Sequence, residues 1–384
     1  MKILRKLIAL ALITILLMSQ QSVLAAETIL IGGNFEMTGA AASYGTPMYN
    51  AMKLAVDQVN EKGGILGGRK LEIKNYDNKS DLTETSSVAT RLIDDGVIGI
   101  VGPATTGDSQ AQIPVITSKK VPAVLPAATG DGITTGDDGK TLDYLFRVCF
   151  EDSYQGKVAG KYIAEEMKAK KVMLIIDSGL DYSQGVAEAF KKEFESRGGK
   201  VVGKETYTSA DTDFQALLTT VASKDFDVIY APGYYTEMGL MIKQARELGI
   251  TQPIIGGDGF SSPTLVDLAG PENANDIYYT CHFSDASEDK KVQDFIKAYE
   301  EKYKQEPDNF AALSYDATCL LIDAIERANA KSPEAVKKAL EETKDFEGVT
   351  GKFTIDEKHN PIKSVLMVKL KNGKIESTEL ISAE

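Results

Sequence analysis

Short apolar runs alternate with segments of helical periodicity along most of the chain, and this alternation constrains the fold more than any other feature. From Glu27 the order is strand, helix, strand, helix, and it continues through strands predicted at 97–101 and 123–125. A fresh series of the same kind begins after residue 150. Alternating strands and helices predict a mainly parallel sheet with helices on both faces. We therefore predict an α/β protein with two doubly wound parallel-sheet lobes, joined by a hinge with several crossings.

Local signals predict where some of these elements begin and end. Small residues and a proline predict a loop over 39–47, followed by a helix over 49–62. We expect Asp108 or Ser109 to cap the third helix of the first series. Asn372-Gly373, between two apolar runs, predicts a hairpin turn near the C-terminal end.

Three helices predicted after residue 289 have no strands between them. Such a run cannot build a parallel sheet of its own, so we expect it to pack on the first lobe. The N-terminal lobe then comprises 27–147 plus 281–353, and the C-terminal lobe 148–280 plus 354–384. The crossings expected to form the hinge lie near Phe146–Phe150, Tyr278–Phe283 and Gly351–Ile355.

Residues 1–26 have the features of a secretory signal peptide. Three basic residues precede an apolar run at 7–18, and the small residues that follow predict cleavage near Ala25 or Ala26. The apolar run is shorter than the roughly 20 residues that span a membrane, so a transmembrane anchor is the weaker alternative. No cysteine follows the run, so no lipid-anchored form is expected. The sequence thus predicts a periplasmic or otherwise extracytoplasmic protein.

The charge of the chain limits the partners that it can bind. Its 384 residues, enough for roughly two domains, carry a formal net charge of −13 at pH 7, and removal of the signal peptide makes this charge more negative. A strongly acidic exported protein is a poor partner for nucleic acid and for anionic membrane surfaces. We expect neither as a partner, and we expect a monomer.

Hydroxyl and small residues follow two strands of the predicted first lobe. Thr106 follows the strand at 97–101, while Ala127 and Thr129 follow the strand at 123–125. Ligands of open parallel sheets bind at the carboxyl ends of the strands, so we expect the two loops to lie side by side. Hydroxyl groups and free N–H groups at a helix N-terminus bind anions. The loops therefore predict a carboxylate site, with ordinary helix capping by threonine as the alternative.

The predicted second lobe offers an acid and two aromatic residues in equivalent positions. Asp258 follows an apolar strand within Gly256–Gly259, where glycines allow a ligand to approach and the carboxylate can pair with an ammonium group. An Asp in a tight turn is the alternative. Tyr182 and Tyr234 lie on loops after strands, where they can wall a pocket. A place on the surface, or packing between the lobes, is the alternative for both tyrosines.

The sequence offers few parts from which catalytic or metal chemistry can be built. It has no G-x-G-x-x-G after a strand and no G-x-x-x-x-G-K-[ST], H-E-x-x-H or G-x-S-x-G motif. Cys149, Cys281 and Cys319 are not spaced as metal ligands, and buried free thiols are expected. Beyond Cys281-His282 the only other histidine is His359. We therefore predict no enzyme, no catalytic residues, no metal and no cofactor.

Taken together, several segments resemble one family: the periplasmic substrate-binding proteins of branched-chain amino acid ABC transporters, of the leucine/isoleucine/valine-binding type. The resemblance covers nearly all of the mature chain, and the order and spacing of the segments make it specific. The segments are Phe35–Gly45 (FEMTGAAASYG), Val59–Gly67 (VNEKGGILG), the Gly102–Ser109 loop, Leu125–Thr129 (LPAAT) and Tyr234–Arg246 (YYTEMGLMIKQAR).

The resemblance implies a type I periplasmic-binding fold and a role for eight residues. Thr106 matches the family's Ser or Thr that binds the α-carboxylate, and Thr129 matches the Thr that contacts both carboxylate and ammonium. Ala127 matches the residue whose carbonyl accepts from the ammonium. Asp258 stands where the family often has Glu, and this shorter acid is a departure. The aromatic residues matching those that line the family's cleft are Tyr44, Tyr182, Tyr234 and Phe310.

The expected function is capture of a free amino acid, branched-chain or otherwise aliphatic, between two lobes, with delivery to a membrane-embedded ABC permease. A ligand sensor of the same fold, binding an amide or urea-like solute, is the first alternative. An exported α/β hydrolase is a remote alternative, because the sequence offers no Ser-His pairing.

Overall fold

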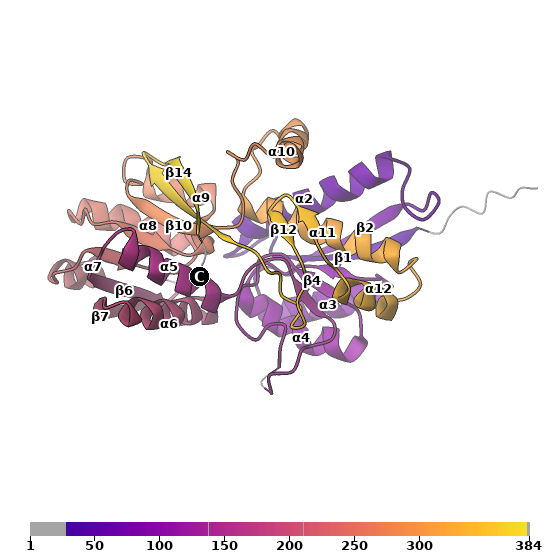
Figure 1. Ribbon diagram of the computed structural model, residues 1–384, viewed down its shortest axis with the longest axis horizontal. Coiled ribbons are helices and arrows are strands. Elements are labelled where there is room, and N and C mark those ends of the chain that lie inside the picture. The colour runs from indigo at the N-terminus through magenta and orange to yellow at the C-terminus, as the bar shows by residue number, and fades with distance from the viewer. Residues whose placement is uncertain (1–27, 137, 210, 382–384) are drawn as a thin grey trace, which may run out of the picture.

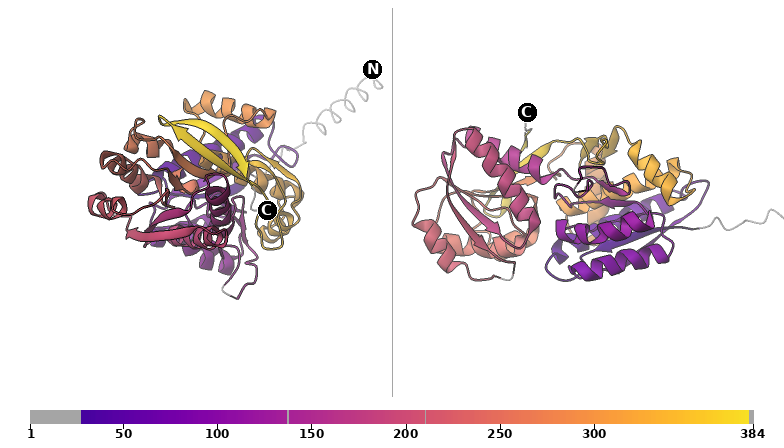
Figure 2. Two further views of the ribbon diagram at one scale, coloured as in Figure 1. Left: turned by 60° about the vertical axis from the view of Figure 1, so that its left-hand side comes forward. Right: turned by 90° about the horizontal axis from the view of Figure 1, so that it is seen from below.

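Two lobes lie side by side along the long axis of the molecule (Figures 1 and 2). The computed structural model describes residues 28–136, 138–209 and 211–381, so the predicted signal peptide lies outside the described residues. Each lobe is built on one large β-sheet with helices on both faces. The two-lobed α/β architecture predicted from the alternation of strands and helices is confirmed.

The sheet of the first lobe has five parallel strands in the order β2-β1-β3-β4-β5. Helices α3 and α4 pack together on one face; on the other, α2 packs with α10 and α11, and α12 packs on α11 (Figure 2). The strands are β1 (Ile29–Phe35), β2 (Leu71–Asp77), β3 (Ile100–Val101), β4 (Ala123–Leu125) and β5 (Leu145–Arg147). The helices are α2 (Ala42–Glu61), α3 (Leu82–Asp94), α4 (Thr106–Lys119), α10 (Lys290–Tyr303), α11 (Asn309–Arg327) and α12 (Pro333–Glu341).

The sheet of the second lobe has seven strands in the order β14-β13-β10-β9-β8-β6-β7, and only β13 and β14 run antiparallel to their neighbours. The strands are β6 (Lys171–Asp177), β7 (Lys200–Tyr207), β8 (Val228–Tyr230), β9 (Ile254–Gly256), β10 (Ile277–Cys281), β13 (Val365–Lys371) and β14 (Lys374–Ile381). Helices α5 (Asp152–Glu165) and α6 (Asp181–Ser196) pack together, as do α7 (Gln215–Ala222), α8 (Tyr235–Glu247) and α9 (Pro263–Ala269). A small hairpin of β11 (Phe346–Gly348) and β12 (Gly351–Phe353) lies apart from both sheets.

Two local predictions have opposite outcomes. The hairpin turn at Asn372-Gly373 is confirmed, since both residues have positive φ and join β13 to β14. The loop predicted over 39–47 is wrong, because α2 already begins at Ala42 and contains Pro47. The reason is tertiary: at Gly45 a Cβ atom would lie 2.2 Å from the Glu36 carbonyl oxygen. A glycine therefore lets the first turns of α2 pack directly on the backbone after β1.

The third connection between the lobes lies later in the chain than the sequence suggested. Arg147 N–H donates to the carbonyl of His359 (3.2 Å), and Arg147 Nε donates to Oδ1 of Asn360 (2.6 Å). Nδ1 of His359 lies 2.9 Å from the Leu145 carbonyl oxygen. The chain thus stays against β5 as far as Asn360 before it enters β13. These contacts favour a crossing at 361–364, rather than a lobe boundary after residue 353.

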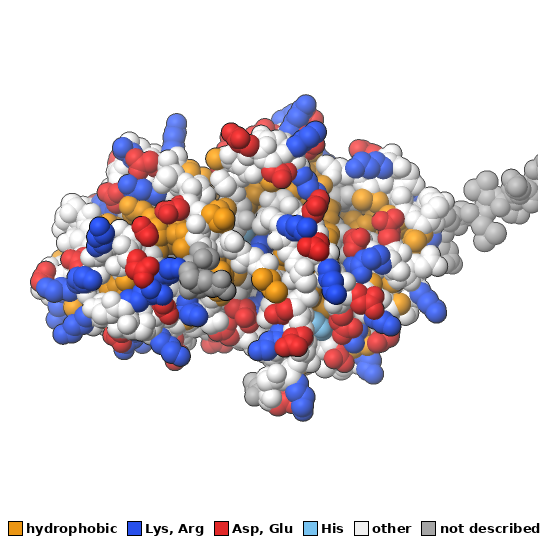
Figure 3. Space-filling model, in the orientation of Figure 1, with side chains coloured by type: hydrophobic (Ala, Val, Ile, Leu, Met, Phe, Trp, Pro, Cys, Tyr) orange, Lys and Arg blue, Asp and Glu red, His pale blue; other side chains and the backbone are white. Residues whose placement is uncertain are grey.

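Acidic and basic side chains are intermixed on the surface rather than gathered by sign, at least on the face that Figure 3 shows. Within the described ranges, no helix is long and apolar enough to cross a membrane.

Candidate functional site

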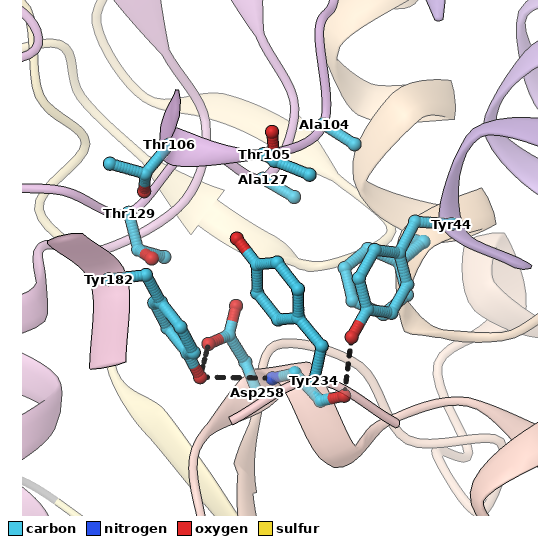
Figure 4. A pocket seen from close by; sticks show the side chains of 11 residues that line it. Tyr44, Ala104, Thr105, Thr106, Ala127, Thr129, Tyr182, Tyr234 and Asp258 are labelled. Atoms are coloured by element: carbon cyan, nitrogen blue, oxygen red, sulfur yellow. Dashed lines mark hydrogen bonds between the residues drawn. The ribbon is translucent and has the colours of Figure 1, made fainter. Parts of the chain in front are cut away.

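Eight residues that the sequence analysis singled out line one cavity between the lobes (Figure 4). The space between these side chains, including the part open to solvent, is about 250 Å³. The eight are Tyr44, Thr106, Ala127, Thr129, Tyr182, Tyr234, Asp258 and Phe310, and the wall is completed by Ala104, Thr105 and Gly259. Residues far apart in the sequence therefore face one enclosed space.

The first lobe contributes the N-terminus of α4 to this cavity. Thr106 is the first residue of α4, and the N-cap is Thr105, whose hydroxyl accepts from the N–H of Asp108 (3.2 Å). The prediction that Asp108 or Ser109 caps this helix is therefore wrong. The carboxylate of Asp108 instead accepts from the hydroxyls of Thr105 (2.7 Å) and Thr85 (2.8 Å), and it is buried. The hydrogen bond to Thr85 of α3 holds Asp108 within α4 rather than at its N-cap.

A second buried acid, Glu36, already binds two N–H groups of the loop that was predicted to bind a carboxylate. Glu36 accepts from the backbone N–H groups of Ala104 (3.0 Å) and Thr105 (3.1 Å). Burial, together with the nearby charge of Asp108, raises the pKa of Glu36 to about 8. Among the described residues, the N–H groups of Thr106 and Gly107 have no acceptor. The predicted anion site is thus limited to these two N–H groups, which lie at the positive end of the helix.

Thr106 and Thr129 make different hydrogen bonds, Thr106 through its hydroxyl and Thr129 through its carbonyl. Thr106 Oγ1 accepts from the N–H of Gly130 (3.1 Å), which leaves its proton to donate elsewhere. At Gly130 a Cβ atom would lie 2.5 Å from the methyl carbon of Thr106, so the close approach of these loops requires glycine. The Thr129 carbonyl accepts from the N–H of Asp152 in the second lobe (2.8 Å). Thr129 therefore lies where the first crossing joins the lobes.

The second lobe contributes a buried acid held by an aromatic hydroxyl. Tyr182 donates to Oδ1 of Asp258 (2.9 Å) and accepts from the N–H of Gly259 (3.1 Å). Gln155 Oε1 accepts from the backbone N–H of Asp258 (2.7 Å). Burial raises the pKa of the Asp258 carboxyl to about 6, and the hydrogen bond from Tyr182 opposes that shift. Tyr182 lies in the first turn of α6 and not on the loop predicted for it.

Aromatic rings form the remaining wall of the cavity (Figure 4). The ring of Tyr44 lies 4.2 Å from that of Phe310 and 5.5 Å from that of Tyr234, measured between centroids. Tyr234 stacks on Tyr182 at 5.3 Å. The end formed by Tyr44, Phe310 and Ala104 contains no charged side chain. One end of the cavity therefore has the positive N-terminus of α4 and the acid Asp258, and the other end is uncharged.

Three polar residues around the cavity were missed from the sequence. Glu36 directly follows β1, the same post-strand position that singled out Asp258, so a usable signal existed. Asp152 is buried at the start of α5, and burial raises its pKa well above the ordinary range despite a hydrogen bond from Thr129. Gln155 carries no local signal, because its role comes from a contact 103 residues away in sequence.

The cysteines and histidines do not assemble a reactive site in the part of the chain that the structure describes. All three cysteines are free; Cys149 and Cys281 are buried as expected, whereas Cys319 is only partly buried, and burial raises the pKa of Cys281 to about 11. His282 stacks on Phe150 with ring centroids 3.6 Å apart. The same residues contain no group of three or more His, Cys, Asp or Glu side chains that could hold a metal ion.

Two α/β lobes that enclose a buried, bipolar cavity define the class of two-lobed solute-binding proteins. The model of the family described as periplasmic binding protein matches residues 28–374. The chain belongs to this family, and it is a solute-binding protein.

Relatives and solved structures are similar over nearly the whole chain. A Leu/Ile/Val-binding protein of Rhizobium johnstonii is 33% identical over 93% of this chain and 95% of its own. A leucine-, isoleucine-, valine-, threonine- and alanine-binding protein of Pseudomonas aeruginosa is 31% identical over 87% of each chain. The structure of the branched-chain amino acid transporter substrate-binding protein LivJ of Streptococcus pneumoniae with isoleucine is 43% identical, with a TM-score of 0.88 over 93% of this chain and 100% of the other.

Proposed function

We propose that the protein captures a free amino acid with an aliphatic side chain and delivers it to an ABC permease. One observation carries the proposal: Thr106, whose N–H at the start of α4 has no acceptor among the described residues, and the Asp258 carboxylate come from different lobes and line one cavity. An anion-binding wall opposite an acid suits a zwitterion. The relatives named above, whose names record branched-chain amino acids, support the same ligand class.

Each part of the ligand has a proposed partner. The N–H groups of Thr106 and Gly107 and the hydroxyl of Thr106 bind the α-carboxylate, while the Thr129 hydroxyl, which donates to Asp152, accepts from the ammonium group. Asp258 and the carbonyl of Ala127 bind the ammonium group. Tyr182 orients Asp258, since its hydroxyl already donates to that carboxylate. Because Asp is one methylene shorter than Glu, the ammonium group must lie closer to η1 (Asp258–Phe260) than a Glu would require.

The uncharged end of the cavity sets the proposed side-chain preference. Tyr44, Tyr234, Phe310 and Ala104 surround this end and offer apolar surface to the ligand. A charged side chain there would lose hydration without gaining a counter-charge, which is costly in a buried site.

Closure links binding to transport in this proposal. Ligand contacts come from both lobes, so the ligand stabilises the closed arrangement over an open one. The lobes rotate about the three crossings, and the closed form docks on the permease. We further propose a monomer that is exported by the signal peptide at 1–26 and released near Ala25 or Ala26 into an extracytoplasmic compartment.

Titration calorimetry with a panel of amino acids and blocked analogues tests this function. We expect isoleucine, leucine or valine to bind, whereas N-acetyl-leucine and leucinamide should bind at least about 100-fold more weakly, because each blocks one charged pole. Urea and short amides, included for the sensor alternative, should not bind. Binding of an amide but of no amino acid would overturn the proposal.

Binding should also depend on pH through Asp258. The pKa of this carboxyl is about 6 without ligand, and an ammonium group favours its ionised form. Ligand binding therefore releases a proton below pH 6. We expect affinity to be nearly constant above pH 7 and to fall by up to about tenfold per pH unit below 6. Calorimetry from pH 5 to 8 measures this slope, and Asp258→Asn should abolish it.

A further inference from the structure

The lobes contact each other directly through residues that do not face the cavity. Tyr235, the first residue of α8, donates its hydroxyl proton to the Ala40 carbonyl (2.9 Å) and accepts from the Ser43 N–H (3.2 Å). The Ser43 hydroxyl lies 3.0 Å from the Thr264 hydroxyl at the start of α9. Ala40 and Ser43 belong to the first lobe, while Tyr235 and Thr264 belong to the second. We call these four residues the α2 latch.

The α2 latch is separate from both the cavity and the hinge. None of its four residues lines the cavity. None lies in the three connections that follow β5, β10 and β12. Its links to the site run through Tyr235, whose N–H donates to the Tyr44 hydroxyl (3.3 Å) and whose ring meets the Tyr44 ring edge-on at 4.9 Å. Rotation of the lobes away from each other must therefore break the hydrogen bonds of the latch, whichever ligand is leaving.

We propose that the α2 latch sets the overall affinity by stabilising the closed form, while the cavity residues alone rank the ligands. The proposal rests on the proposed function only in that some amino acid binds the closed form. A contact made equally with every ligand changes the closed population by one factor, and the apparent dissociation constant of each ligand changes by that same factor. Discrimination between ligands stays unchanged.

Tyr235→Phe is the direct test, because phenylalanine keeps the ring against Tyr44 and removes only the hydroxyl. Two hydrogen bonds between the lobes are lost, and the freed backbone groups become hydrated in the open form. We expect dissociation constants for isoleucine, leucine and valine to rise by the same factor, about tenfold. Thr264→Val removes one hydrogen bond and should raise all three by about threefold. Calorimetry gives the constants, and stopped-flow fluorescence should show faster release.

Tyr303→Phe is the matched control. The hydroxyl of Tyr303 donates to the Asn50 carbonyl (2.7 Å), so that hydrogen bond joins α10 to α2 inside the first lobe. This variant should leave all three affinities within about twofold of the original. Unchanged affinities in Tyr235→Phe, or factors that differ more than about threefold between ligands, would overturn the latch. Failure of the proposed function is distinct, since the unmodified protein would then bind no amino acid.

Discussion

Replacing Asp258 with Asn should weaken amino-acid binding by about 100-fold or more. Asp258 is 3% exposed, and it is the one charged side chain that lines the cavity. Removing one partner of a buried charge pair costs about 2–5 kcal/mol, because the ligand's ammonium group is then enclosed without a counter-charge. Asn preserves the shape and the acceptor for Tyr182, so the cavity itself should persist. Titration calorimetry with isoleucine measures the loss.

Stability measurements separate this loss of binding from misfolding. Burial disfavours the charged form of Asp258, and its raised pKa of about 6 leaves most of it ionised at pH 7. A neutral amide at this position carries no such cost, so the ligand-free Asp258→Asn variant should unfold at the same temperature or slightly higher. Asp267→Asn, an exposed acid on α9, is the matched control and should change neither property. Affinity within about threefold of the original in Asp258→Asn would contradict the assigned role.

Replacing Arg147 with Ala should lower the free energy of unfolding by about 3–5 kcal/mol, the range for breaking a buried ion network. Arg147 is fully buried at the end of β5. Its guanidinium donates to the carbonyls of Ala128 (3.2 Å) and Gly130 (2.8 Å) and to the Glu151 carboxylate (2.6 Å). Loss of the side chain leaves buried carbonyl groups without donors, each at about 1–3 kcal/mol. Urea denaturation followed by circular dichroism measures the change.

Arg197→Ala provides the control for Arg147→Ala. Arg197 also forms ion pairs, with Glu165 and Glu193, but its side chain is 27% exposed. Surface pairs contribute about 0–1 kcal/mol, so this variant should lose no more than that. Equal losses in the two variants would show that burial of Arg147 contributes nothing. The carbonyls of Ala128 and Gly130 flank Thr129, so Arg147→Ala should also weaken ligand binding, whereas Arg197→Ala should not.

The parts of the site that were predictable follow from strand position. Thr106, Ala127 and Asp258 each follow a predicted strand, and parallel strands end at one edge of a sheet. Their strand positions therefore predicted these three residues at the cleft, and the family resemblance predicted Tyr44 and Phe310. The prediction of a loop over 39–47 was wrong because the local signal was misleading. Small residues and Pro47 predicted a loop, yet the start of α2 is helical because Gly45 packs against the backbone of Glu36.

The sequence by itself determined the two mainly parallel sheets and the loops at the ends of their strands, because apolar periodicity and strand ends are local properties of the chain. Only the tertiary structure decided which groups are free to bind. Glu36 accepts from the N–H groups of Ala104 and Thr105 across 68 and 69 residues, and this leaves the N–H groups of Thr106 and Gly107 as those without an acceptor among the described residues. Tyr235 meets Ser43 across 192 residues. Such hydrogen bonds depend on how two distant segments approach in space, which no spacing within either segment encodes.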